Sequence, residues 1–179
     1  VETVARDGDG IDVLFLNAGV ATAAPLTETD DETFDRLVNV NFRGPWLALR
    51  AAVPHLKPGA SVVINTSVSN VKGIPGFGIY AATKAAVRSL VRTAAAELSG
   101  MGIRVNAVSP GPVETPIFGK VGLTEAQVDE FQEGIATQVP LGRMGKASEI
   151  AGAVAFLASD DAAYVQGAEL AVDGGMTQA

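Results

Sequence analysis

Three side chains have the types and spacing of an acid–base site: Ser67, Tyr80 and Lys84. Tyr80 follows Ser67 by 13 positions, and Lys84 follows Tyr80 by four. On a helix, residues four apart lie on one face, one above the other. A lysine ammonium beside a phenol favours the phenolate, so the tyrosine pKa is expected to fall from about 10 towards neutrality. Such a tyrosine could pass a proton at neutral pH while the serine hydroxyl holds the substrate oxygen. A rim tyrosine beside a solvated lysine is the simpler alternative.

The elements that would position these side chains alternate along the chain. Short apolar runs are separated by helical patterns, which predicts βαβ units and a parallel sheet. The predicted fold class is therefore α/β, a doubly wound parallel sheet of Rossmann type, with residues 1–179 as a single domain. Strands are expected at residues 11–16, 61–65, 104–108 and 169–172. Helices are expected from a capping-box pattern at 29–32 through Phe42, and over residues 80–98, 124–131 and 148–157.

Three segments follow the expected strands directly: Asn17-Ala18-Gly19, the segment at Ser67, and Pro110-Gly111. In open parallel sheets, ligands bind beyond the carboxyl ends of the strands. Each segment alone is typical of an ordinary strand-exit turn. Because all three lie where such a ligand would bind, the pattern favours a cofactor cleft.

Asn41 lies within an expected helix, where asparagine is not favoured. Pro45 follows four residues later and has no N–H, so the Asn41 carbonyl would lose its helical partner and the helix should kink. That carbonyl would then be free to hold a water molecule. A kinked helix with a solvated asparagine is the alternative.

Six motifs along the chain have an order and spacing shared with a known family. They are Asn17-Ala18-Gly19, Asn39-Val40-Asn41-Phe42-Arg43-Gly44, Ile64-Asn65-Thr66-Ser67-Val68-Ser69, Tyr80-Ala81-Ala82-Thr83-Lys84, Arg104-Val105-Asn106-Ala107-Val108-Ser109-Pro110-Gly111 and Val172-Asp173-Gly174-Gly175. Over nearly its whole length the chain resembles the short-chain dehydrogenase/reductase family in its single-domain form. One small departure is Leu16, where the family usually has another asparagine.

The resemblance implies an NAD(P)-dependent enzyme, with either NAD or NADP as cofactor, that interconverts a secondary alcohol and a ketone. It implies that Ser67 holds the substrate oxygen, Tyr80 acts as acid or base, Lys84 lowers the tyrosine pKa and binds the nicotinamide ribose, and Asn41 holds a relay water. Ser69 fits less well, because it precedes Tyr80 by only 11 positions. The cofactor-binding residues are expected to be Asn17, Ala18, Gly19, Tyr80, Lys84, Pro110, Gly111, Val113 and Thr115.

The sequence departs from the family pattern at its N-terminal end. No G-x-G-x-x-G or T-G-x-x-x-G-x-G motif occurs, and these motifs hold the dinucleotide pyrophosphate. The chain starts at Val1, inside what would be the helix before the family's fourth strand. The fold is therefore expected to be N-terminally truncated, either in the protein itself or because the sequence is part of a longer one. These 179 residues alone are expected to bind dinucleotide poorly.

Composition excludes several other classes of protein. The chain has 47% apolar and 18% charged residues, a formal charge of −7, no cysteine and one histidine. No basic cluster favours nucleic acid or an anionic membrane surface, and neither a disulfide framework nor a metal site is expected. No apolar stretch approaches the ~20 residues of a membrane span. No signal peptide pattern opens these 179 residues, although a missing front would hide one, and the predicted location is cytoplasmic.

Substrate, alternative function and assembly are predicted less directly. The stretch from Ile117 to Val139 lies where the family has its substrate lid, and its apolar residues favour an apolar alcohol or ketone, although they could simply dock the lid to the core. A non-catalytic scaffold or partner protein that has lost the cofactor site is the alternative function. The resemblance implies a homodimer or homotetramer, paired through the helices that carry Asn41 and Tyr80, with Ala94-Ala95-Ala96 allowing close packing.

Overall fold

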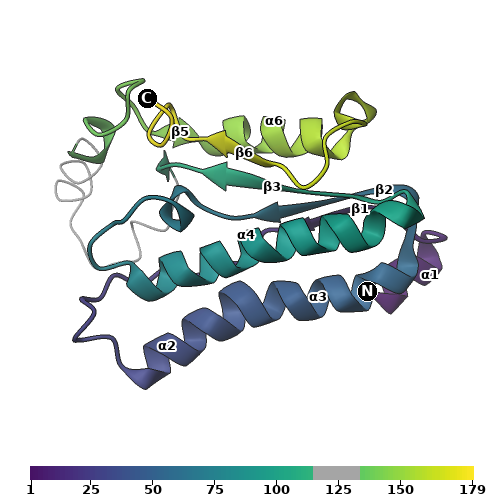
Figure 1. The fold of residues 1–179 in the computed structure, drawn as a ribbon, viewed down its shortest axis with the longest axis horizontal. Coiled ribbons are helices and arrows are strands. Elements are labelled where there is room, and N and C mark those ends of the chain that lie inside the picture. Colours follow the sequence, from purple (N-terminus) through teal and green to yellow (C-terminus); the bar gives the residue numbers. More distant parts are fainter. Residues whose placement is uncertain (115–133) are drawn as a thin grey trace.

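Parallel strands form the centre of the protein (Figure 1). The computed structural model describes residues 1–114 and 134–179. Within these residues the main sheet has four strands in the order β1-β2-β3-β6, every neighbouring pair parallel. The strands are β1 (Ile11–Leu16), β2 (Leu56–Asn65), β3 (Arg104–Pro110) and β6 (Glu169–Val172). A short pair of strands, β4 (Val113–Glu114) and β5 (Gly145–Lys146), lies apart from this sheet. The predicted parallel α/β sheet is confirmed.

Helices cover both faces of the sheet, as a doubly wound fold requires (Figure 1). On one face lie α4 (Gly78–Leu98) and, beside it, the helix formed by α2 (Asp31–Val38), a π-helical turn (Asn39–Arg43) and α3 (Gly44–Ala52), which packs on β1. On the other face lies α6 (Ala147–Ala158), and the short α1 (Glu2–Asp7) precedes β1. No helix within the described ranges is long and apolar enough to cross a membrane.

The core is divided by the alternation of side chains along the strands. Val62 and Ile64 of β2 pack with the α3 and α4 side of the core, whereas Val63 packs with Val108 and with Leu157 of α6. The central strands β2 and β3 are covered on both faces, whereas Val13 and Phe15 of β1 remain 49% and 39% exposed.

Strand register brings the predicted functional segments to one edge of the sheet. Leu16 pairs with Ile64, Asn65 with Val108, and Pro110 with Val172. The chain leaves β1, β2 and β3 at this edge, immediately before Asn17, Thr66 and Gly111 respectively.

Three local predictions are corrected by the structure. β2 begins at Leu56 rather than at residue 61, because Leu56 pairs with Ile11 across an irregular register. The α2 helix is capped by Asp30, whose carboxylate accepts a 2.8 Å hydrogen bond from the Thr33 N–H, and not by Thr29. Ala94 and Ala95 pack inside the core, so they are not available to a partner subunit. The predicted helix at residues 124–131 lies outside the described residues.

Candidate active site

Ser67 lies in the turn that follows β2. Its backbone is extended and it precedes a short 3-10 turn, Val68–Asn70, whose start it caps by accepting a 3.2 Å hydrogen bond from the Ser69 N–H. The Ser67 Oγ also lies 3.2 Å from Ser69 Oγ, and both side chains are buried. Ser69 therefore supports Ser67 from within the turn.

Tyr80 and Lys84 lie in the first two turns of α4, facing the edge of the sheet where the strands end. Lys84 Nζ is 5.8 Å from the centre of the Tyr80 ring. Lys84 is 4% exposed and donates a 2.9 Å hydrogen bond to the carbonyl of Asn65, the last residue of β2. The Ser67 hydroxyl lies near enough to the Tyr80 phenol to lower its pKa. The structure therefore brings the serine, the tyrosine and the lysine together.

The pKa of Tyr80 is shifted in the direction opposite to the prediction. Burial raises the pKa of Tyr80 above its ordinary value, and the hydrogen bond with Ser67 only partly offsets this rise. Burial also lowers the pKa of Lys84 to about 8. The predicted fall of the tyrosine pKa is wrong for this structure, because removing the phenol from water disfavours the phenolate. The Tyr80 side chain is a protonated phenol at neutral pH.

Asn41 lies in the π-helical turn between α2 and α3 and is 1% exposed. The Gly44 N–H donates to the Asn39 carbonyl five residues earlier, so a π turn occurs where a kink was predicted. The Asn41 amide forms a two-way pair with the backbone of Val20: Oδ1 accepts from the N–H at 2.8 Å and Nδ2 donates to the carbonyl at 2.9 Å. The alternative of a solvated asparagine is therefore wrong. Asn41 holds the chain just after Gly19.

The segment after β1 passes close to the lysine. Asn17, Ala18 and Gly19 are exposed. A Cβ added at Gly19 would lie 3.4 Å from Lys84 Nζ and 3.4 Å from Asn41 Oδ1. A side chain there would fill the space in front of the ammonium, which is open to a ligand because residue 19 is glycine. An ammonium has three donors, and within the described part of the chain one of them is used. These residues therefore fit a polyhydroxyl ligand such as a dinucleotide ribose.

Pro110 ends β3, and Gly111 and Val113 follow it at the same edge of the sheet. The Gly111 N–H donates to the Val172 carbonyl at 3.0 Å. A Cβ at Gly111 would lie 2.7 Å from the Cα of Asp173, so packing against the end of β6 requires glycine here. Thr115, like most of the predicted lid from Ile117 to Val139, lies outside the described residues. Val139 is described, and it is buried near Gly174.

Two contributors to this region were missed by the reasoning from sequence. The Asn65 carbonyl receives the lysine hydrogen bond, and the Asn65 side chain donates to Asn17 Oδ1 at 2.8 Å. Asn65 Oδ1 is buried, and none of the residues that the structure describes forms a hydrogen bond with it. The position of Asn65 at the end of an apolar strand could have indicated that it contributes to the site. The other is Glu169, whose charge is unusual in a half-buried apolar strand.

Comparison with known proteins agrees with this geometry. Residues 1–177 match the family described as "Enoyl-(Acyl carrier protein) reductase". A 3-oxoacyl-[acyl-carrier-protein] reductase of Thermotoga maritima is 40% identical over 178 residues, which cover 98% of this chain and 70% of that protein. The chain is a short-chain dehydrogenase/reductase. Its family relation identifies it as an NAD(P)-dependent oxidoreductase.

Other proteins similar to this short-chain dehydrogenase/reductase are named as dehydrogenases of different compounds. A cyclopentanol dehydrogenase of Comamonas is 38% identical over 181 residues, covering 99% of this chain and 70% of the relative. The ligand-free structure of an aldohexose dehydrogenase of Thermoplasma acidophilum superposes with a TM-score of 0.92 at 28% identity, covering 98% of this chain and 71% of that one. The chain spans about 70% of the length of these relatives.

Proposed function

We propose that this protein interconverts a secondary alcohol and a ketone with NAD or NADP, through Ser67, Tyr80, Lys84 and Asn41. The observation that carries the proposal is the Lys84 ammonium. It is buried 5.8 Å from the Tyr80 ring, and it hydrogen-bonds a backbone carbonyl rather than a carboxylate in the described residues. A buried charge of this kind is costly, and such groups concentrate at functional sites.

The residues that would hold the dinucleotide are those at the strand ends and on the first turns of α4. They are Asn17, Ala18, Gly19, Tyr80, Lys84, Pro110, Gly111, Val113 and, beyond the described residues, Thr115. When bound, the nicotinamide supplies or accepts a hydride at the reacting carbon. Lys84 would bind the ribose hydroxyls through the donors it does not give to Asn65.

In this proposal the proton is transferred by the side chains of the site, with Tyr80 as the acid or base. The Ser67 hydroxyl would hold the substrate oxygen beside the Tyr80 phenol. In the reducing direction the phenol gives its proton to that oxygen, and in the oxidising direction the phenolate takes it back. Because burial raises the pKa of Tyr80, the phenol starts in the protonated form that reduction requires. The Lys84 ammonium favours the phenolate left after transfer. The Asn41 carbonyl would hold a water that returns the proton.

The substrate is proposed to be a small, largely apolar alcohol or ketone. The support is the relation to a cyclopentanol dehydrogenase and the apolar residues between Ile117 and Val139. The full-length protein should therefore reduce cyclopentanone and a longer methyl ketone with a higher kcat/KM than pyruvate. A panel in which the charged ketone is preferred would contradict an apolar substrate.

Replacement of Tyr80 by phenylalanine tests the mechanism. Tyr80→Phe removes one oxygen from a half-buried ring, so the fold should be kept while turnover of ketone and NADH or NADPH is lost. Circular dichroism and the unfolding midpoint verify the fold, and nicotinamide absorbance measures turnover. Tyr164→Phe is the matched control, because it makes the same change at the other tyrosine of the chain, which is fully exposed and is assigned no role in the site. Retained turnover in Tyr80→Phe would remove tyrosine from the mechanism.

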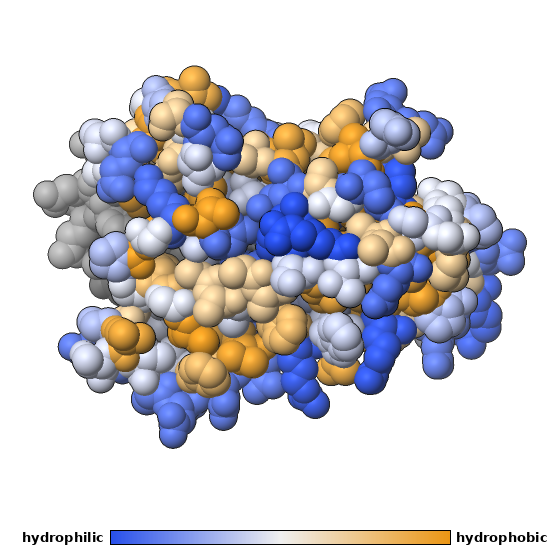
Figure 2. All heavy atoms as spheres, viewed as in Figure 1, coloured by the Kyte–Doolittle hydropathy of each residue, from blue (hydrophilic) through white to orange (hydrophobic). Residues whose placement is uncertain are grey.

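We also propose that the protein forms a homodimer or homotetramer through the helices that carry Asn41 and Tyr80. Figure 2 shows apolar residues gathered on this face, over α4 and the α2–α3 helix. A shallow apolar groove of about 140 Å³ lies between these helices, lined by Val38, Phe42, Ile79, Ala82, Thr83 and Ala86. Phe34 and Trp46 are about half exposed nearby on the α2–α3 helix. Light scattering that gives the mass of one chain would contradict this assembly.

A further inference from the structure

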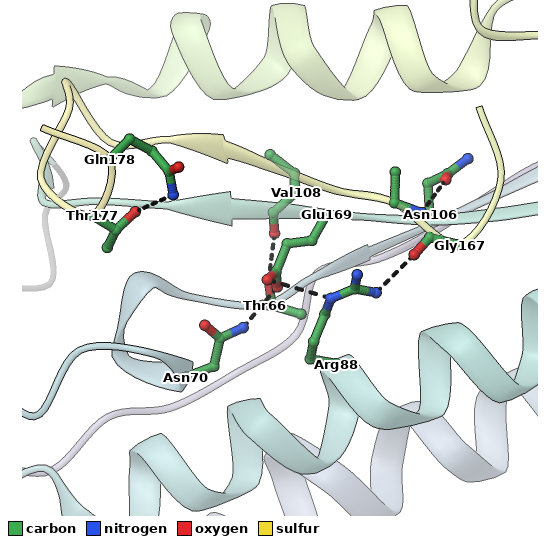
Figure 3. A network of polar contacts seen from close by, with 10 residues as sticks. Thr66, Asn70, Arg88, Asn106, Val108, Gly167, Glu169, Thr177 and Gln178 are labelled. Carbon is green, nitrogen blue, oxygen red and sulfur yellow. Dashed lines mark hydrogen bonds and ion pairs between the residues drawn. The ribbon is translucent and has the colours of Figure 1, made fainter. Parts of the chain in front are cut away.

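A second polar cluster lies beside the candidate active site, around the carboxylate of Glu169 in β6 (Figure 3). Oε1 of this carboxylate accepts hydrogen bonds from Thr66 Oγ1 at 2.5 Å and from Asn70 Nδ2 at 2.7 Å. Oε2 lies 3.4 Å from Nε of Arg88, and each charged side chain is 15% exposed. A largely buried carboxylate is costly unless it is paired and hydrogen-bonded, and here it is both.

The two residues that share one carboxylate oxygen enclose Ser67. Thr66 precedes the serine, and Asn70 ends the 3-10 turn that follows it. Thr66 is also fixed at the sheet, because its N–H donates to the Val108 carbonyl at 2.9 Å. The Asn70 N–H donates to the Ser67 carbonyl at 3.0 Å, which closes the turn. Glu169 therefore holds both ends of the segment that presents Ser67.

The same carboxylate connects this turn to the helix that carries the tyrosine. Arg88 lies four residues after Lys84 and eight after Tyr80, so the three side chains follow one another along one side of α4. Arg88 NH1 also donates to the Gly167 carbonyl at 2.9 Å, at the approach to β6. A series of polar contacts runs from the serine turn through the Glu169 carboxylate and the Arg88 guanidinium to α4. It links Ser67 to Tyr80 without involving the Ser67 hydroxyl or the Tyr80 phenol.

We propose that Glu169 is a positioning residue, which sets the place of the Ser67 hydroxyl relative to the Tyr80 phenol by holding the turn from Thr66 to Asn70 against α4. This inference rests on the proposed function. A displacement of about 1 Å at a reacting group can reduce turnover by about 10²-fold, so a clamp on the serine turn has a measurable kinetic effect.

A double-mutant cycle on the full-length protein tests the kinetic part of this inference. Glu169→Gln keeps the size of the side chain but removes the charge that Arg88 pairs with. It should lower kcat for cyclopentanone by about ten-fold or more while the KM for NADH or NADPH changes by less than about two-fold. In a Ser67→Ala background, the same substitution should change kcat by less than about two-fold, because the group it positions is already absent. Equal losses of kcat in both backgrounds would overturn the proposal.

The matched control is Asn106→Ser in β3. Asn106 is fully buried. Its side-chain amide donates to the Val165 carbonyl and accepts from the N–H of Ala168, the residue before Glu169. Neither of these two hydrogen bonds involves the serine turn. This variant loses buried hydrogen bonds without loosening the turn, so its kcat should be that of the wild type. A control that loses as much kcat as Glu169→Gln would show general destabilisation and overturn the proposal.

Hydrogen exchange separates the clamp from the proposed function, because it does not depend on turnover. Backbone amides of residues 66–71, measured by mass spectrometry, should exchange faster in Glu169→Gln than in the wild type. In Asn106→Ser their exchange rates should equal those of the wild type. Unchanged exchange in Glu169→Gln would overturn the clamp even if kcat fell. If the wild type turns over no alcohol or ketone, the proposed function fails, and the exchange result alone decides whether Glu169 holds the turn.

Discussion

Lys84 and Arg88 are two cations one turn apart on α4, the first buried and the second partly buried, and their neighbouring groups differ. Arg88 is paired with the Glu169 carboxylate and hydrogen-bonded to the Gly167 carbonyl. Lys84 donates to the Asn65 carbonyl, and no ion pair of Lys84 is found among the described residues. Burial lowers the pKa of both groups, and for Arg88 the nearby carboxylate opposes the shift.

The difference separates a cation that supports structure from one that is available for chemistry. A paired guanidinium is satisfied in the folded chain, so removing it leaves an uncompensated carboxylate. An ammonium without a carboxylate gains a counter-charge only when a neighbouring group becomes negative, as the Tyr80 phenol does when it gives up its proton. We therefore expect loss of Lys84 to act mainly on turnover and loss of Arg88 to act mainly on stability.

The largest effect is expected from Lys84→Met. Loss of the ammonium should lower kcat by about 10²- to 10⁴-fold, because the phenolate of Tyr80 would then form without a neighbouring positive charge. The free energy of unfolding should not fall, because methionine fills the same space without a buried charge. Steady-state kinetics and urea unfolding on the same preparation measure both quantities. A kcat within ten-fold of the wild type would place Lys84 outside the mechanism.

Arg88→Met should act mainly on stability, with a fall in kcat no larger than that of Glu169→Gln, because it breaks the same link. The free energy of unfolding should fall by about 3 kcal/mol, because the Glu169 carboxylate stays buried without its partner. Urea unfolding measures the loss, and the double variant Arg88→Met with Glu169→Met should recover most of it. If Arg88→Met is as stable as the wild type, the pair does not hold β6 to α4, and the contrast with Lys84 is lost.

The pH dependence of stability sharpens the contrast further. The pKa of Lys84 is lowered from 10.5 to about 8, so between these values the unfolded chain carries a proton that the folded chain has released. Stability therefore gains a contribution from this residue as pH rises from about 8 to about 10.5, at most about 3 kcal/mol. Unfolding measured across this range should show the gain in the wild type and not in Lys84→Met. An equal slope in both would assign it to other groups.

Much of the fold followed from local pattern. The strands at 11–16 and 169–172 have the predicted bounds, because each ends where a short, mainly apolar run is followed by Asn17 or Asp173. The π turn at Asn41 was not foreseen, because one extra residue in a helical turn leaves the recurrence of Phe34, Val38 and Phe42 almost unchanged.

The proximity of Tyr80 and Lys84 followed from the sequence, whereas the pKa of Tyr80 did not. The i to i+4 spacing predicted that Tyr80 and Lys84 share a face, which needs only helix geometry. The direction of the tyrosine pKa depends on how much water the fold removes, and sequence does not give this. The Glu169 cluster joins residues that lie 81 to 103 positions apart, so no local pattern could reveal it.

A pair of glycines gives the smallest and most selective test of the comparison. Gly19 has a backbone conformation that other residues adopt, and a Cβ there would lie 3.4 Å from Lys84 Nζ. Gly167 has a φ of +68°, and its carbonyl accepts from Arg88. Gly19→Ala should therefore raise the KM for NADH or NADPH by about ten-fold with little change in stability, because the methyl group fills space in front of the ammonium.

Gly167→Ala should do the opposite. Alanine in this left-handed conformation costs about 1 to 2 kcal/mol, so the unfolding midpoint should fall while the dinucleotide KM is unchanged. The two variants add the same single methyl group, one beside the cation assigned to chemistry and one beside the cation assigned to structure. If both lower stability and neither changes the KM, the space in front of Lys84 is not a ligand site, and Lys84 and Arg88 would have to be explained in the same way.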